Sequence, residues 1–82
     1  MYEIILSDLA KNQLAKLSQD IKNRIGAVLE RIRIRPLSFV KRLVGSPYYR
    51  LRVGDYRIIV DIQEDKLIIF VIELGHRKNI YK

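Results

Sequence analysis

The sequence predicts an α+β fold in the order β-α-α-β-β-β, with an antiparallel meander sheet and an N-terminal helical hairpin packed on one face. Two changes of pattern predict it. Apolar residues recur at helical spacing between residues 8 and 34, and from residue 48 they alternate with the period of two that is typical of strands. The length of 82 residues leaves room for one domain, residues 1–82.

The N-terminal part is expected to form one short strand and two helices. The strand covers Tyr2–Leu6, and Ser7 or the following aspartate can cap a first helix over Asp8–Leu17. A second helix is expected from about Asp20 to Ile34, ended by Pro36. Its apolar residues form one stripe, made by Ile21, Ile25, Val28, Leu29 and Ile32.

The C-terminal part is expected to form the meander. Residues 37–47 are assigned to a loop. Three strands follow, over Tyr48–Val53, Tyr56–Ile62 and Leu67–Leu74. Gly54-Asp55 is a signal for a two-residue hairpin turn, and Gly75 is expected to end the last strand.

The net charge of +7 is unevenly distributed. Residues 1–30 are balanced, residues 31–57 carry an excess of +7, residues 58–75 carry −3, and the tail from residue 76 holds three bases without an acid. Such segregation favours a polyanionic partner, because surfaces that serve only solubility usually intersperse both signs. A basic face that is merely solvated is the alternative.

The expected hairpin gathers arginines on one face of the sheet. With a two-residue turn, Arg52 lies opposite Arg57, and Arg50 lies opposite Ile59. Tyr48 falls on the same face, while the alternate apolar residues face the helices. Like charges that face each other across a sheet are destabilising, so the arginine pair indicates a site that binds a phosphate. The alternative is screening by salt, Asp61 or Glu73.

Composition excludes several other classes. The chain has no cysteine, so neither disulfides nor cysteine-ligated metals are expected. No cluster of histidines or carboxylates stands at metal-ligand spacing, and no cofactor is implied. No apolar run has the roughly 18–20 residues that span a bilayer, so no membrane partner is expected and the cytoplasm is the predicted location.

Two segments carry a resemblance to a known family. They are Gly45-Ser46-Pro47-Tyr48-Tyr49-Arg50-Leu51-Arg52-Val53-Gly54-Asp55-Tyr56-Arg57-Ile58-Ile59 and Gly75-His76-Arg77-Lys78-Asn79-Ile80-Tyr81. The chain resembles the RelE/ParE superfamily of toxins over essentially its whole length. The second segment resembles the RelE-type branch, which implies a metal-independent endoribonuclease that cuts mRNA in the ribosomal A site through attack by the 2′-hydroxyl.

The resemblance implies catalytic roles for four residues. Arg57 is expected to contact the scissile phosphate, with Arg77 beside it as stabiliser or general acid. Tyr81 would orient or deprotonate the 2′-hydroxyl; the alternative is an aromatic that pins the tail to the sheet. Arg52 is expected to stabilise charge, because arginine is almost never deprotonated.

Further residues are expected to bind RNA. Arg50 would contact the backbone, and Tyr48 would stack on a base or pack against an arginine stem. His76 can exchange a proton near neutral pH, or it is an ordinary surface histidine at a strand end. Diffuse attraction to RNA is expected from Lys41, Arg42 and Lys78.

The resemblance also implies binding partners, and it leaves several alternative functions open. A cognate RelB-like antitoxin protein is expected, together with the ribosome and mRNA. The main rival is a ParE-like inhibitor of DNA gyrase, which would share the fold without RNA chemistry. A non-catalytic RNA-binding or ribosome-associated module and a toxin with decayed catalysis are the other readings.

Overall fold

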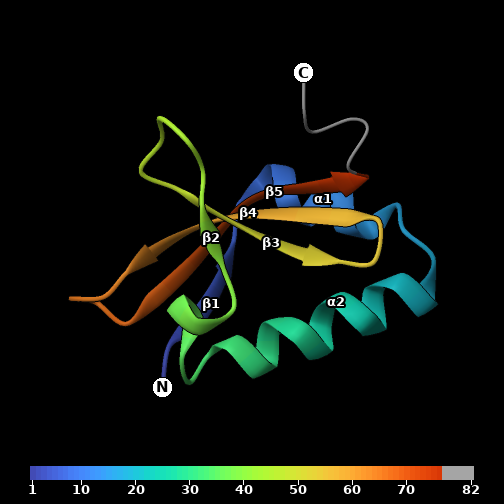
Figure 1. Cartoon of the computed structure of the whole chain (residues 1–82). Helices are drawn as coiled ribbons and strands as arrows, with labels where there is room; N and C mark the ends of the chain where they lie inside the picture. The colour runs from blue at the N-terminus through green and yellow to red at the C-terminus, as the bar shows by residue number, and fades with distance from the viewer. Residues whose placement is uncertain (77–82) are drawn as a thin grey trace.

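A computed structural model describes residues 1–76 and confirms the α+β class (Figure 1). Two helices pack on a five-stranded mixed sheet whose strand order is β1-β5-β4-β3-β2. The elements are β1 (Glu3–Leu6), α1 (Asp8–Ala15), α2 (Gln19–Ile32), the 3₁₀ turn η1 (Pro36–Ser38), β2 (Lys41–Arg42), β3 (Tyr49–Val53), β4 (Tyr56–Gln63) and β5 (Ile68–His76). Within the described part of the chain, no helix is long and apolar enough to cross a membrane.

Both helices form where the apolar spacing predicts them, with shorter C-terminal ends. Ser7 and Ser18 are the N-caps, and each side-chain oxygen accepts a hydrogen bond from a backbone N–H three residues on. The first helix ends at Ala15 rather than Leu17, and the second runs over 19–32 rather than 20–34. The second helix ends early because the N–H of Arg33 bonds to the Glu30 carbonyl, which tightens the last turn.

Two of the sequence-based predictions for the sheet were wrong. The segment 37–47 is not all loop, because η1 and β2 lie at its start and middle. Gly75 does not end the last strand, because it pairs with Arg57 and the next residue, His76, pairs with Tyr56 at the start of β4. The β5 strand therefore includes both residues. The β1 strand joins the same sheet by pairing parallel to β5, from Glu3 opposite Ile68 onward.

The predicted β3–β4 turn is confirmed residue by residue. Val53 pairs with Tyr56, and Arg52 pairs with Arg57, so Gly54-Asp55 is the whole turn. Gly54 has a φ of +59°, in the left-handed region that favours glycine. A Cβ at this position would also lie 3.4 Å from Nη2 of Arg24, because the start of α2 reaches the hairpin tip. The turn therefore fixes the register of the two strands.

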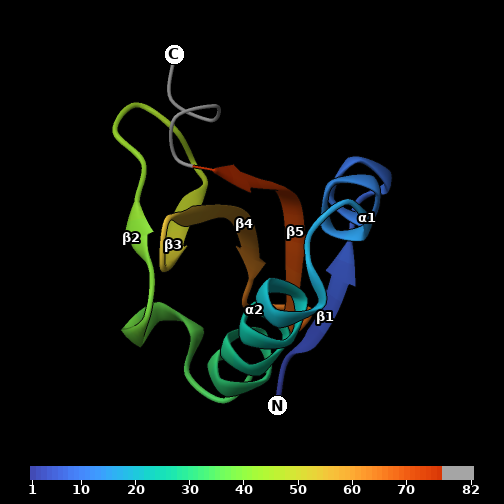
Figure 2. The same ribbon diagram turned by 90° about the vertical axis from the view of Figure 1, so that its right-hand side faces the viewer.

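The core lies between α2 and one face of the sheet (Figure 2). Ile25, Leu29 and Ile32 of α2 are buried against alternate residues of the strands. The buried residues of β3, β4 and β5 in this cluster are Leu51, Val53, Ile58, Val60, Ile69, Val71 and Leu74. The opposite face of the sheet is the one left for the arginines.

The α1 helix completes the edge of β5 where β1 stops. Beyond the last β1 pair, the Ser7 hydroxyl donates to the Ile72 carbonyl at 2.5 Å, and the N–H of Leu74 donates to Gln13 Oε1 at 2.7 Å. The pairing of β4 with β5 also shifts here, since Ile59 faces Glu73 whereas its neighbour Val60 faces Val71. A β-bulge is thus held by side chains of the first helix.

Removing the Gln13 acceptor should lower stability. Gln13→Leu would leave the half-buried N–H of Leu74 without this partner, at a cost of about 1–3 kcal/mol in the free energy of unfolding. Gln13→Glu, which keeps a side-chain oxygen, is the matched control. Urea denaturation followed by circular dichroism measures both; equal midpoints for Gln13→Leu and the unmodified chain would contradict the bond's structural role.

The β4–β5 turn contains a non-glycine residue in the left-handed region. Leu67 has a φ of 55° and is exposed. Leu67→Gly should have a free energy of unfolding about 1 kcal/mol higher than that of Leu67→Ala, measured by urea denaturation. Both variants lose the leucine side chain, and only glycine relieves the backbone strain. Equal stability of the two variants would show that the turn does not strain this position.

Candidate nucleic-acid interface

The open face of the sheet carries three arginines in the predicted register. Arg52 of β3 lies directly opposite Arg57 of β4, and Arg50 lies opposite Ile59. Arg52 is exposed, whereas Arg50 and Arg57 are half-buried, and the Nε of Arg57 is shielded from solvent. The site is therefore built on rigid strands, with the Arg57 side chain held by its surroundings.

Lys41 extends this row, and Arg42 does not. Lys41 of β2 pairs with Arg50, and residues that pair directly share a face. Arg42 pairs with Tyr49 on the other face, where its guanidinium lies 5.3 Å from the ring centroid and Nη2 donates to the tyrosine hydroxyl at 3.4 Å. We define the arginine face as Lys41, Arg50, Arg52 and Arg57.

Acidic residues reach the same face at some distance from the arginine pair. Glu73 faces Ile59, which makes it a diagonal neighbour of Arg57 at about 7–8 Å between backbones. Asp61 lies four residues along β4 from Arg57, about 13 Å away at the strand rise. Glu73 can therefore offset part of the positive charge, while Asp61 is too far to neutralise it.

A glycine stands beside the arginine pair. Gly75 is the β5 partner of Arg57, so the row across the sheet reads Arg52, Arg57 and Gly75. The third position of this row therefore carries no side chain. Two guanidiniums on adjacent strands suit a phosphate, which guanidiniums bind through paired hydrogen bonds.

The structure separates His76 from this face. His76 pairs with Tyr56, and the two rings meet edge to face with centroids 5.7 Å apart, on the side of the sheet that faces the helices. The placement differs from the expected grouping because the bulge on β5 changes which residues of the strand share a face. Tyr48 lies just before β3 and is exposed. Arg77, Lys78 and Tyr81 lie outside the described residues.

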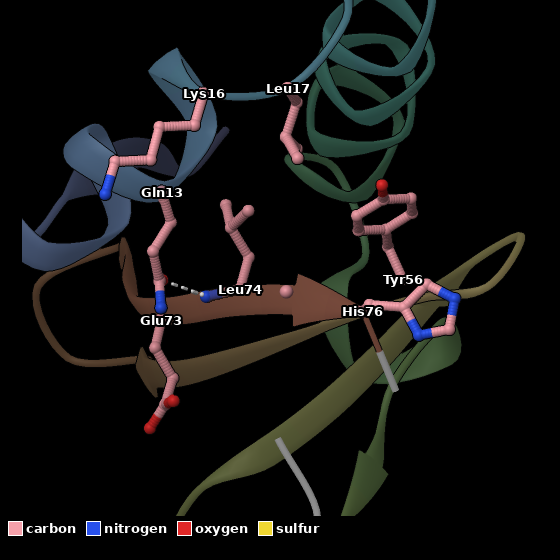
Figure 3. Close-up of a pocket in the computed structure, with 8 residues that line it drawn as sticks. Gln13, Lys16, Leu17, Tyr56, Glu73, Leu74 and His76 are labelled. Carbon is pink, nitrogen blue, oxygen red and sulfur yellow. Dashed lines mark hydrogen bonds between the residues drawn. The ribbon is translucent and has the colours of Figure 1, made fainter. Parts of the chain in front are cut away.

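A pocket of about 320 Å³ opens where α1 ends beside β5 (Figure 3). Its lining residues are Gln13, Lys16, Leu17, Tyr56, Glu73, Leu74, Gly75 and His76. Sequence reasoning missed it, because the pocket depends on how α1 packs along β5. In the described part of the chain, no group of histidine and carboxylate side chains could hold a metal ion.

Comparison with protein families identifies the chain as a toxin of the RelE/ParE superfamily. The family model described as the ParE toxin of the type II toxin–antitoxin system parDE matches residues 4–81, so the chain belongs to that family. No curated protein sequence gives a significant match.

Solved structures agree on the fold. A chain of the archaeal RelE–RelB complex from Pyrococcus horikoshii OT3 is 24% identical with a TM-score of 0.82, covering 95% of this chain and 97% of that one. The intact E. coli RelBE complex gives 23% identity and a TM-score of 0.80, covering 93% and 96%. The RelB–RelE complex from Methanococcus jannaschii gives 27% and 0.74, covering 95% of each chain.

The arginine pair should lower the stability of the fold when no anion is bound. Arg52→Gln should raise the free energy of unfolding by about 0.2–1 kcal/mol at low salt, because it removes a like-charge cross-strand pair. The gain should shrink as salt rises. Arg31→Gln, which removes an exposed arginine from α2, is the control. A lower stability of Arg52→Gln in urea denaturation would mark Arg52 as a structural ion-pair partner.

Proposed function

We propose that this toxin inhibits translation by cutting mRNA in the ribosomal A site, with the 2′-hydroxyl of the RNA as the nucleophile. The observation that carries the proposal is the opposed pair Arg52 and Arg57 beside Gly75 on the open sheet face. Like charges directly opposite each other disfavour the fold, whereas an RNA phosphate between them would turn that repulsion into affinity.

The chemistry requires positioning and charge stabilisation. The attacking 2′-oxygen, the phosphorus and the leaving 5′-oxygen must lie in line, and the phosphorane that forms carries extra negative charge. Arg57, on a central strand and half-buried, would hold the phosphate in place, and Arg52 would share the developing charge. Arg50 and Lys41, which pair with each other on β3 and β2, would bind the RNA backbone on that side of the arginine pair.

Proton transfer is assigned to the tail. Arginine remains protonated, so the arginine face supplies charge rather than a base. By resemblance, Tyr81 would orient or deprotonate the 2′-hydroxyl, and Arg77 would stabilise the developing charge or protonate the leaving oxygen; both assignments belong to the proposal. His76 lies on the opposite side of the sheet from Arg57, which argues against a direct role at the same phosphate.

A RelB-like antitoxin is the proposed protein partner. The solved structures with this fold include RelE–RelB complexes from a bacterium and from archaea, and the matching family belongs to a two-component toxin–antitoxin system. A strongly basic toxin of net charge +7 suits an acidic partner.

A gyrase inhibitor is the second candidate. It is favoured by one observation, the match of residues 4–81 to the ParE toxin model. The two functions separate in a supercoiling assay with purified DNA gyrase. Inhibition of supercoiling without any RNA cleavage would support the ParE-type activity and contradict the ribonuclease.

Arg57→Ala should abolish most of the cleavage. Loss of one donor that stabilises transition-state charge typically lowers a rate about 10²–10³-fold. Cell-free translation followed by primer extension on the message should show codon-phased cuts with the unmodified chain, and those cuts should fade in Arg57→Ala and Arg52→Ala.

Arg31→Ala is the matched control, because it removes the same charge from α2. Circular dichroism should show all three variants folded. Translation arrest without new RNA ends, or cuts that persist unchanged in folded Arg57→Ala, would contradict the proposed mechanism.

A further inference from the structure

Glu73 brings a carboxylate to the arginine face from the β5 strand. It pairs with Ile59, whose partner on β3 is Arg50, and residues that pair directly share a face of the sheet. The next residue along β5, Leu74, is buried in the core, so Glu73 belongs to the opposite side. Figure 3 agrees, since Leu74 points toward Leu17 and Glu73 extends in the opposite direction.

The Glu73 side chain is available to a ligand. It is half-buried, yet none of the hydrogen bonds and ion pairs within residues 1–76 involves its carboxylate. Asp61, which lies on the same face, differs because one of its carboxylate oxygens accepts a hydrogen bond from Gln63 Nε2 at 3.2 Å. Glu73 therefore offers an acceptor that the described part of the chain leaves unused.

The Glu73 carboxylate weakens the attraction between the arginine face and any phosphate strand. Arg52 and Arg57 would hold a phosphate of DNA as well as one of RNA, because both backbones carry the same charge. Glu73 repels both strands alike. A strand recovers this loss only where it places a hydrogen-bond donor beside the carboxylate. The donor that separates the two nucleic acids is the 2′-hydroxyl, which RNA has and DNA lacks.

The strand register places this acceptor beside the phosphate site and not within it. Glu73 is the diagonal neighbour of Arg57, one strand over and two residues along, at about 7–8 Å between backbones. This separation is comparable to the length of one nucleotide in an extended strand. A phosphate bound at Arg57 thus brings the ribose of the adjoining nucleotide within reach of Glu73. The 2′-hydroxyl of that ribose is not the one that attacks at the cut.

We propose that Glu73 accepts a hydrogen bond from the 2′-hydroxyl of the nucleotide next to the cut, and so makes the arginine face selective for RNA over DNA. The inference rests on the proposed RNA substrate. An ionised carboxylate only accepts hydrogen bonds, and its bonds to hydroxyl donors are charge-assisted and short. A DNA strand on the same face meets the repulsion of Glu73 without gaining this bond.

The selectivity can be measured with two labelled single strands of one sequence. A 2′-fluoro strand keeps the phosphate charge and sugar shape of RNA but has no 2′-hydroxyl, so it can neither donate this bond nor cut itself. At low salt the unmodified chain should bind the RNA strand about fivefold more tightly than the 2′-fluoro strand, since one hydrogen bond separates them. Fluorescence anisotropy gives both dissociation constants, and electrophoresis checks that the RNA stays intact. If it is cut, a 2′-amino strand, which keeps a donor and resists cleavage, replaces it.

Variants of the two acidic residues decide whether Glu73 is responsible. In Glu73→Ala the ratio of the two dissociation constants should fall to about one, and the 2′-fluoro strand should bind more tightly because the repulsion is gone. Asp61→Ala, which removes a carboxylate from the same face further along β4, is the matched control and should keep the ratio. Glu73→Gln retains the side-chain shape and should at least halve the ratio, because a neutral acceptor bonds more weakly.

Three results would overturn the inference. The first is equal binding of the two strands by the unmodified chain. The second is a ratio that stays unchanged in folded Glu73→Ala, or in Glu73→Gln if Glu73→Ala does not fold. The third is an equal loss of the ratio in Glu73→Ala and Asp61→Ala, which would assign the preference to the summed negative charge of the face.

Failure of this inference and failure of the proposed function are distinguishable. If translation assays show cuts that depend on Arg57 while the ratio does not depend on Glu73, the ribonuclease stands and the role of Glu73 falls. If no message is cut but the ratio is lost in Glu73→Ala, the face stands as an RNA-selective binding surface without cleavage.

Discussion

Two positive charges held face to face across adjacent strands are the constraint around which this toxin is organised. Arg52 and Arg57 cannot move apart, because a two-residue turn at Gly54-Asp55 locks the register one pair away. The same alternation that places both arginines on the open face of the sheet buries Leu51 and Ile58 beneath α2. Burial of the apolar core thus offsets the repulsion between the two arginines, and the pair remains on the open face of the sheet.

The first helix contributes to this arrangement from the side of the sheet. Instead of covering only apolar surface, it supplies polar atoms of Ser7 and Gln13 to backbone groups of β5 that β1 does not reach. An edge strand with unpaired backbone groups invites association with other chains. Here those groups are satisfied internally, and a pocket opens where α1 ends beside β5.

Sequence reasoning succeeded where structure is local and failed where it is not. The β3–β4 register could be predicted because a short turn and strict alternation determine it within ten residues. The parallel pairing of β1 with β5 joins residues more than sixty positions apart, and nothing in the local pattern signals it. For the same reason the face of His76, and the pocket to which it belongs, could not be predicted from spacing. Arg42 was grouped with Lys41 because adjacent charges look alike in sequence, although adjacent strand residues face opposite ways.

The bulge near Ile72 divides β5 into two parts whose side chains alternate between the faces of the sheet in opposite phase. Upstream of it, β5 is scaffold, with Ile69 and Val71 buried in the core. Downstream, Glu73 and Gly75 belong to the face that we propose meets RNA, and His76 to the pocket rim. Deleting the extra residue would exchange the two faces of the downstream half while leaving the upstream half intact. The strand therefore presents two alternations joined by a phase shift, and Leu74, buried in the core downstream of the bulge, keeps the second half part of the fold.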